Sequence, residues 1–332
     1  MQKIAGITAV VVLMLAIVSS GCVCAAPFDE TVSQAMQTLD VSKGDPGLLV
    51  LTDAPYVKVD GECALPWLAK AQEKTGCTVG RGNLLFFQRT QDHPFRLMLF
   101  RKKDGDAVIL SRMENRWITD TLNIGPSAIS RPAFWEKIDR YQAGRDLFSL
   151  AAMANAWAKG APYDFLKSAE LHNHICPGLT SGYLMAHYII DHFPLEQGER
   201  YIVVACPVWC KEDAFQVVMD CTAGKKGLIV KPLSDDQKKQ IVIANPAGMI
   251  LVWDAEKKTG RGAALSFNFD PLRALSSKDT PKAAMVLAAV DHLDHPDRFV
   301  SMAAEFQLDE ELYEAITQAG GNPWEATGLV KK

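Results

Sequence analysis

The sequence predicts an α+β fold in which one module of strands and helices occurs twice. In each half a short apolar strand is followed by a helical pattern, a glycine-rich loop and further strands. Both halves also share the loop sequence Cys-Thr-x-Gly, which begins at Cys77 in the first half and at Cys221 in the second. The common order and the common loop favour a duplicated module over a chance match.

Hydrophobic periodicity and turn residues predict the elements of the first half. We expect a strand at 47–52 and a helix at 64–74, followed by strands at 84–87, 96–100 and 107–111. The last two strands are joined by a turn at Asp104-Gly105. Cys63 and Cys77 lie at opposite ends of the predicted helix, and their spacing leaves a disulfide between them open.

The remaining elements follow in the same way. Helical patterns occupy 133–141 and 145–159, and a helix is expected at 178–192. In the second half we expect a strand at 201–205 and a helix at 211–220, followed by strands at 228–230, 240–244, 249–253 and 263–267. Two more helices are expected at 281–293 and 309–319. The predicted organisation is a signal peptide at 1–25, a first module at 26–125, a helical connector at 126–165 and a second module with C-terminal helices at 166–332.

The amino-acid composition restricts the classes of partner that the protein can bind. The 332 residues include 35 Lys and Arg and 39 Asp and Glu, which gives a formal net charge of -4. A chain this close to neutrality carries no electrostatic footprint for nucleic acid and no polybasic surface for anionic lipid. The expected partner is a small molecule or a metal ligand.

The N-terminal residues predict export. Lys3 is followed by an uncharged run whose most apolar stretch, 7–18, has the length of a secretory signal, and Val23 and Ala25 favour cleavage after Ala25. We therefore expect an exported protein of the periplasm or cell envelope. Cys22 after Ser20-Gly21 offers a lipoprotein site as an alternative. A lipid or an uncleaved anchor is the expected route to membrane association.

The densest group of reactive side chains is His172, His174 and Cys176. Alternate residues share one side of an extended segment, so we expect an extended backbone here. Pro177 suits the first turn of the following helix, which leaves Cys176 near the N-cap, where the helix dipole favours the thiolate. Cys210 precedes another predicted helix and Cys221 follows it. These residues can bind a metal such as zinc, remain as buried thiols or form disulfides.

Three ordered motifs resemble the FmdE family, named for the E subunit encoded with formylmethanofuran dehydrogenase. They are His172-Asn173-His174-Ile175-Cys176-Pro177-Gly178, Cys210-Lys211-Glu212-Asp213-Ala214-Phe215-Gln216 and Cys221-Thr222-Ala223-Gly224-Lys225. The resemblance implies an α+β fold with a mixed sheet, a tendency to form homo-oligomers, and zinc or another divalent transition metal. The implied metal ligands are His172, His174, Cys176, Cys210 and Cys221, and Asp213, Gln216 and Lys225 are the expected ligand-binding residues.

The sequence departs from the family pattern at Asn173, Asp220 and Lys226. The first half keeps the third motif but lacks the His-x-His-x-Cys segment, so we expect an internal pseudo-dimer whose first half has lost most of its metal site. Residues with weaker signals, each also explained as a surface or core position, are Cys77, Arg81, His93, His187, Asp191, Cys206, His292 and His295.

Two functions compete on this evidence. The first is an exported metal-binding protein that binds or delivers a divalent metal or a metal-bearing small molecule. The alternative is a metal-dependent enzyme that uses an open metal position in a cleft between the two modules. A purely structural metal is a third interpretation. The sequence does not predict formylmethanofuran oxidation by this chain, because no cysteine spacing typical of iron–sulfur clusters is present.

Overall fold

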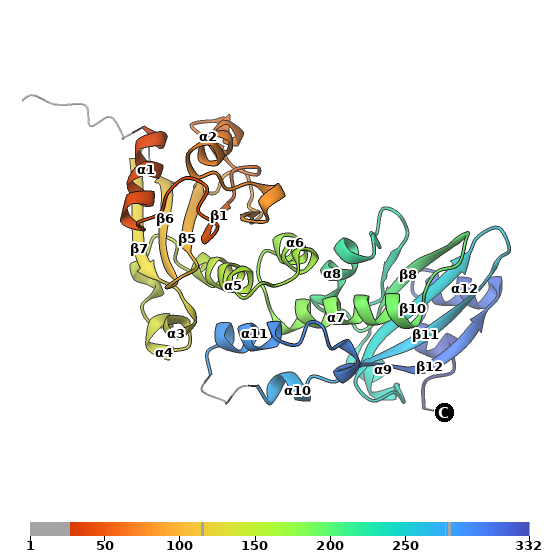
Figure 1. Cartoon of the computed structure of the whole chain (residues 1–332). Coiled ribbons are helices and arrows are strands. Elements are labelled where there is room, and N and C mark those ends of the chain that lie inside the picture. Colours follow the sequence, from red (N-terminus) through yellow and green to blue (C-terminus); the bar gives the residue numbers. More distant parts are fainter. Residues whose placement is uncertain (1–26, 114–115, 276, 278–279, 332) are drawn as a thin grey trace, which may run out of the picture.

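Two mixed β-sheets covered by helices confirm the α+β fold (Figure 1). The structure is a computed structural model that describes residues 27–113, 116–275, 277 and 280–331. The predicted signal peptide and the lipoprotein alternative at Cys22 lie outside the described residues. Within the described part, no helix combines the length and the hydrophobicity that a bilayer crossing requires.

The first sheet has the strand order β4-β1-β5-β6-β7. Its strands are β1 (Leu48–Thr52), β4 (Leu84–Phe86), β5 (Arg96–Arg101), β6 (Asp106–Met113) and β7 (Arg116–Asn123). One face is covered by α1 (Phe28–Thr38) and α2 (Leu65–Thr75), where Phe28 and Trp67 stack at 5.2 Å. The short elements β2 (Lys58–Val59), β3 (Glu62–Cys63) and η1 (Val79–Arg81) lie in the connections.

The second sheet has the order β12-β11-β10-β8-β9. Its strands are β8 (Glu199–Ala205), β9 (Leu228–Val230), β10 (Pro246–Asp254), β11 (Thr259–Phe267) and β12 (Val300–Leu308). On one face it packs against α7 (Pro177–His192), α8 (Lys211–Val218) and α10 (Asp270–Arg273). On the other it packs against α12 (Glu310–Thr317) and α13 (Pro323–Ala326), with Trp324 fully buried.

The two sheets share pairing directions and register. In each, the first strand pairs in parallel with the strand after the glycine loop, Val50 with Leu84 and Val203 with Leu228. All other pairs are antiparallel. This agreement supports the predicted duplication, which remains an inference.

Helices of the connector join the sheets. They are α3 (Pro126–Ile129), α4 (Pro132–Trp135), η2 (Ile138–Arg140), α5 (Asp146–Ala158) and α6 (Tyr163–His172). With α11 (Lys282–Val290) they form one apolar core that runs from the first sheet to the start of α7. A side chain at the α6–α7 turn is therefore held by both halves of the chain.

Some sequence predictions of secondary structure were wrong. Residues 235–240 form helix α9 (Asp235–Gln240) and 241 makes only an isolated bridge to Val330, because a Ser234–Gln237 capping box starts a helix just before the apolar run. The helix expected at 133–141 is broken into α4 and η2. The edge strands β7 and β12 were missed, since their residues alternate between exposed and half-buried and carry a weak hydrophobic signal.

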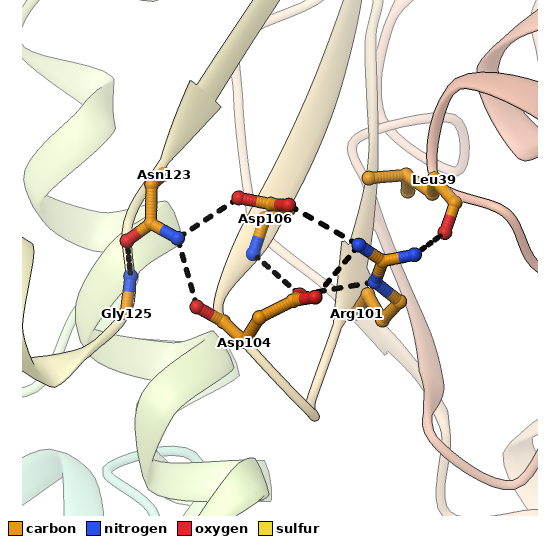
Figure 2. A network of polar contacts seen from close by, with 6 residues as sticks. All are labelled: Leu39, Arg101, Asp104, Asp106, Asn123 and Gly125. Carbon is orange, nitrogen blue, oxygen red and sulfur yellow. Dashed lines mark hydrogen bonds and ion pairs between the residues drawn. The ribbon is translucent and has the colours of Figure 1, made fainter.

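The β5–β6 turn contains a polar network around Arg101 (Figure 2). The guanidinium binds Asp104, Asp106 and the Leu39 carbonyl, and its hydrogen bond lowers the pKa of Asp104. The Asn123 amide donates to the Asp104 carbonyl at 2.8 Å. Gly105 has φ +80°, and a Cβ there would lie 2.3 Å from the Gly125 Cα.

Gly105→Ala should therefore destabilise the protein by about 2 to 4 kcal/mol, because backbone strain adds to a clash with backbone atoms. Gly61→Ala is the matched control, since Gly61 has φ +84° but nothing within 4 Å of its Cβ position. We expect the control to cost only about 1 kcal/mol in chemical denaturation. Equal losses for the two variants would contradict the close approach at Gly105.

A buried charge cluster anchors the start of α5. Asp146 at the first turn of α5 pairs with Arg89 at 2.6 Å and also with Arg96. The Arg96 backbone N–H donates to Asp53 Oδ1 at 2.8 Å, whereas Asp53 Oδ2 has no hydrogen-bond partner among the described residues. Burial raises the pKa of Asp53 from 3.8 to about 7.

This pKa predicts a pH dependence of stability. Between pH 4 and 7 the folded protein binds more protons at Asp53 than the unfolded chain, so the free energy of unfolding should fall as pH rises, by up to about 4 kcal/mol. Asp53→Asn should flatten this part of the profile in denaturant titrations at pH 4, 5, 6 and 7. The exposed Asp139→Asn variant should retain the wild-type profile, and an unchanged profile in Asp53→Asn would refute the assignment.

Candidate metal site

The turn between α6 and α7 presents the first two ligand candidates. Helix α6 ends at His172, Asn173 adopts the left-handed conformation with φ 65°, and Cys176 caps α7 by accepting a hydrogen bond from the Leu179 N–H at 3.3 Å. The extended backbone expected for 172–176 is therefore wrong, because a helix end and a helix start share this segment. The predicted positions of Cys176 and Pro177 at the start of α7 are confirmed.

The third ligand candidate lies at the start of α8. Cys210 is the residue that precedes α8, and the start of this helix packs closely on α7. A Cβ at Gly182 would lie 2.2 Å from the Lys211 carbonyl oxygen, and one at Gly178 would lie 2.9 Å from the Cys210 Cβ. Hydrogen is thus the only side chain that permits this approach.

Together these elements place a nitrogen and two sulfurs at one point. The ligand atoms of His172, Cys176 and Cys210 all lie within 4.8 Å of one another, and the His172 Nε2 is 3.5 Å from the Cys176 Sγ. In a tetrahedral zinc site, ligand atoms are separated by about 3.3 to 3.8 Å. The donor set and this separation fit a divalent transition metal, and three protein ligands leave one position for another donor.

A carboxylate orients the imidazole. The Nδ1 of His172 donates to Asp213 Oδ2 at 2.7 Å, and the Gln216 amide donates to Asp213 Oδ1 at 3.1 Å. In the neutral, metal-binding form of the ring this arrangement leaves the lone pair on Nε2, which faces Cys176. Asp213 and Gln216 therefore lie beside the ligand candidates, and Asp213 contacts them through His172.

The two thiols at the site differ in their pKa values. Burial raises the pKa of Cys176, but hydrogen bonds from His172, His174 and the Leu179 N–H outweigh it, so the pKa lies well below the usual value. Burial likewise lowers the pKa of His172, and Asp213 and Cys176 more than reverse this effect. Without a metal, both shifts favour a Cys176 thiolate beside a His172 imidazolium. Burial and the neighbouring Cys176 raise the pKa of Cys210.

His174 lies beside this group without being part of it. Its ring centroid is 4.3 Å from that of His172, and its imidazole hydrogen bonds to Cys176. Phe148 of α5 contacts the His174 ring at 5.9 Å. Sequence reasoning missed Phe148, because its distance along the chain gives no signal of this contact.

Cys221 lies apart from the three ligand candidates. Its thiol faces the carbonyls of Met219 and Tyr201 at 3.5 and 3.8 Å in the core under β8. In the first half, the thiol of Cys77 donates to the Leu48 carbonyl at 3.4 Å, at the same register position. The buried thiol of the Cys-Thr-x-Gly loop thus has the same packing position in both halves.

The other cysteine and lysine candidates make contacts away from the metal-site residues. The Lys225 ammonium is exposed and pairs with Asp220 at 2.5 Å, and Lys226 is also exposed. Cys206 is buried on the other side of the second sheet, where its sulfur accepts a hydrogen bond from Trp324 at 3.2 Å. The six cysteines that the structure describes are free thiols, Cys63 and Cys77 included.

The remaining candidates occupy local surface interactions. Arg81 donates to the Gly76 carbonyl, and His93 contacts Thr90. His187 binds Asp164 at 3.1 Å. Asp191 is exposed, the half-buried His292 contacts Arg298, and the exposed His295 contacts Asp294.

Comparison with known proteins agrees with the motifs. Residues 171–311 match a family model described as "FmdE, Molybdenum formylmethanofuran dehydrogenase operon". No curated protein matches the chain. The matched residues include the ends of α6 and β12 and all three ligand candidates. Residues 171–311 of this chain are therefore similar to the FmdE family.

Proposed function

We propose that this protein is an exported metal-binding protein that holds zinc, or another divalent transition metal, through His172, Cys176 and Cys210. The observation that carries the proposal is the convergence of one imidazole and two thiols within 4.8 Å. The hydrogen bond from His172 to Asp213 supports it, because metal-binding histidines usually donate their second ring N–H to such a partner. Export rests on the uncharged N-terminal run of the sequence.

Delivery of a metal or of a metal-bearing small molecule is the function that this site would serve. Three protein ligands leave a position that an incoming donor can take, which suits exchange better than a closed four-ligand staple. The same open position supports the second candidate, a metal-dependent enzyme in which bound metal would act as a Lewis acid. The residues of this chain would hold the metal and, through Asp213, orient His172.

The first test is metal content. Protein purified without chelator should contain about one metal ion per chain, as a single site requires. Cys176→Ser and Cys210→Ser should lose the metal while remaining folded by circular dichroism. Cys221→Ser and Cys206→Ser are matched controls that remove buried thiols outside the ligand group, and they should keep it. Metal retained in Cys176→Ser, or lost in Cys221→Ser, would contradict the assignment.

The second test concerns Asp213. Asp213→Asn should lower metal affinity by about 10- to 100-fold, because the amide no longer holds the His172 N–H as a carboxylate does. Affinity can be measured by competition with a chromophoric chelator. Asp191→Asn, an exposed carboxylate of α7, should leave the affinity unchanged. Equal affinities for all three proteins would show that Asp213 does not support a metal ligand.

A further inference from the structure

The sulfurs of Cys176 and Cys210 lie close enough to react with each other. Both cysteines directly precede helices, α7 and α8, and these helices pack side by side (Figure 1). The two sulfur atoms lie within 4.8 Å of each other, and the two thiols are in hydrogen-bond contact. A disulfide bond is about 2.05 Å long, so closing the remaining gap of less than about 3 Å would join them.

The backbone around the pair also suits a disulfide. A Cβ at Gly178, two residues after Cys176, would lie 2.9 Å from the Cys210 Cβ and 3.4 Å from its sulfur. In a disulfide the two β-carbons are about 3.8 Å apart. The start of α7 is thus in contact with the Cys210 side chain before any bond forms.

Access and partners distinguish this pair from the other buried thiols. Cys210 is half-buried, so a small reagent can reach its sulfur, whereas Cys176 is only 5% exposed. Cys206 contacts the Trp324 indole, and Cys221 faces backbone carbonyls. Neither of these two cysteines belongs to the ligand group. A reaction that starts at Cys210 would therefore be completed by Cys176.

We propose that Cys176 and Cys210 form a reversible disulfide that competes with the metal for the same two sulfurs. The inference rests on the proposed metal function and adds redox control of that site. The co-reactant is a small-molecule disulfide of the oxidised glutathione class. Export, which the N-terminal run predicts, would place the pair in an oxidising compartment, where disulfides persist.

The exchange takes place in two balanced steps. The Cys210 thiolate attacks one sulfur of the small disulfide, which forms a mixed disulfide and releases the first small thiolate. The Cys176 thiolate then attacks the Cys210 sulfur, which joins the two cysteines and releases the second small thiolate. Two electrons pass from the cysteines to the reagent, and the released thiolates take protons from water. A bound metal ion would leave with its charge unchanged, because the metal ligand is the thiolate.

The test compares reduced and oxidised wild-type protein. Reduced, metal-free protein is treated with oxidised glutathione and desalted, and its zinc affinity is measured by competition with a chromophoric chelator. We expect oxidation to lower the zinc affinity by at least about 100-fold, because two of the three protein ligands are lost. Dithiothreitol followed by desalting should restore the affinity. Zinc added before the oxidant should slow the oxidation, since both sulfurs then bind the metal.

Peptide mapping identifies the bond. A non-reducing tryptic digest of oxidised protein should link the peptide that contains Cys176 to the peptide that contains Cys210. Cys206 lies in the same tryptic peptide as Cys210, so Cys206→Ser is the matched control and should keep both the link and the loss of zinc affinity. Cys176→Ser should instead retain a glutathionyl group on Cys210, because no neighbouring thiolate removes it.

The outcomes separate this inference from the metal function. A Cys206–Cys210 bond inside one peptide, glutathione adducts without a link, or a link that leaves the zinc affinity unchanged would overturn the inference. Each of these results leaves the metal function intact, provided that the reduced protein binds zinc. Reduced protein that binds no zinc would overturn the proposed function, and the redox control with it.

Discussion

The first turn of α8 packs against α7 at Gly178 and Gly182, where any larger side chain would meet the backbone or the β-carbon of the neighbouring segment. This contact sets the position of Cys210 relative to Cys176, and it brings Asp213 within hydrogen-bond distance of His172. The four side chains come from three helices. Their convergence therefore depends on helix packing and only indirectly on the spacing of the residues along the chain.

The cysteines of the metal site and those of the two Cys-Thr-x-Gly loops have different surroundings. Cys176 and Cys210 lie at helix N-termini next to polar side chains; the pKa of Cys176 is lowered there, whereas burial and the neighbouring Cys176 raise the pKa of Cys210. Cys77 and Cys221 lie under a strand and face backbone carbonyls, and burial raises the pKa of each thiol to about 11. The two groups are separated by geometry: Cys176 and Cys210 converge with the His172 imidazole, whereas Cys77 and Cys221 each face backbone carbonyls.

The connector gives the two halves different roles at the site. Glu170 of α6 accepts a hydrogen bond from the Phe86 N–H of β4, which ties the helix before His172 to the first sheet. Asp146 and its two arginines fix the start of α5, and α5 carries Phe148 to His174. The first half thus supports the surroundings of the metal site, although none of its own residues belongs to the ligand group.

The sequence by itself determined the α+β class, most of the elements, the N-cap position of Cys176 and the similarity of residues 171–311 to the FmdE family. Periodicity, turn residues and motifs are local properties of the chain. It did not determine the backbone conformation between His172 and Cys176. An extended segment and a turn between two helices can both bring these two side chains together. Only the tertiary structure shows that Cys210 lies in the ligand group whereas Cys221 does not, and that Phe148 contacts His174. Both outcomes depend on how helices distant in sequence pack, which the local pattern does not encode.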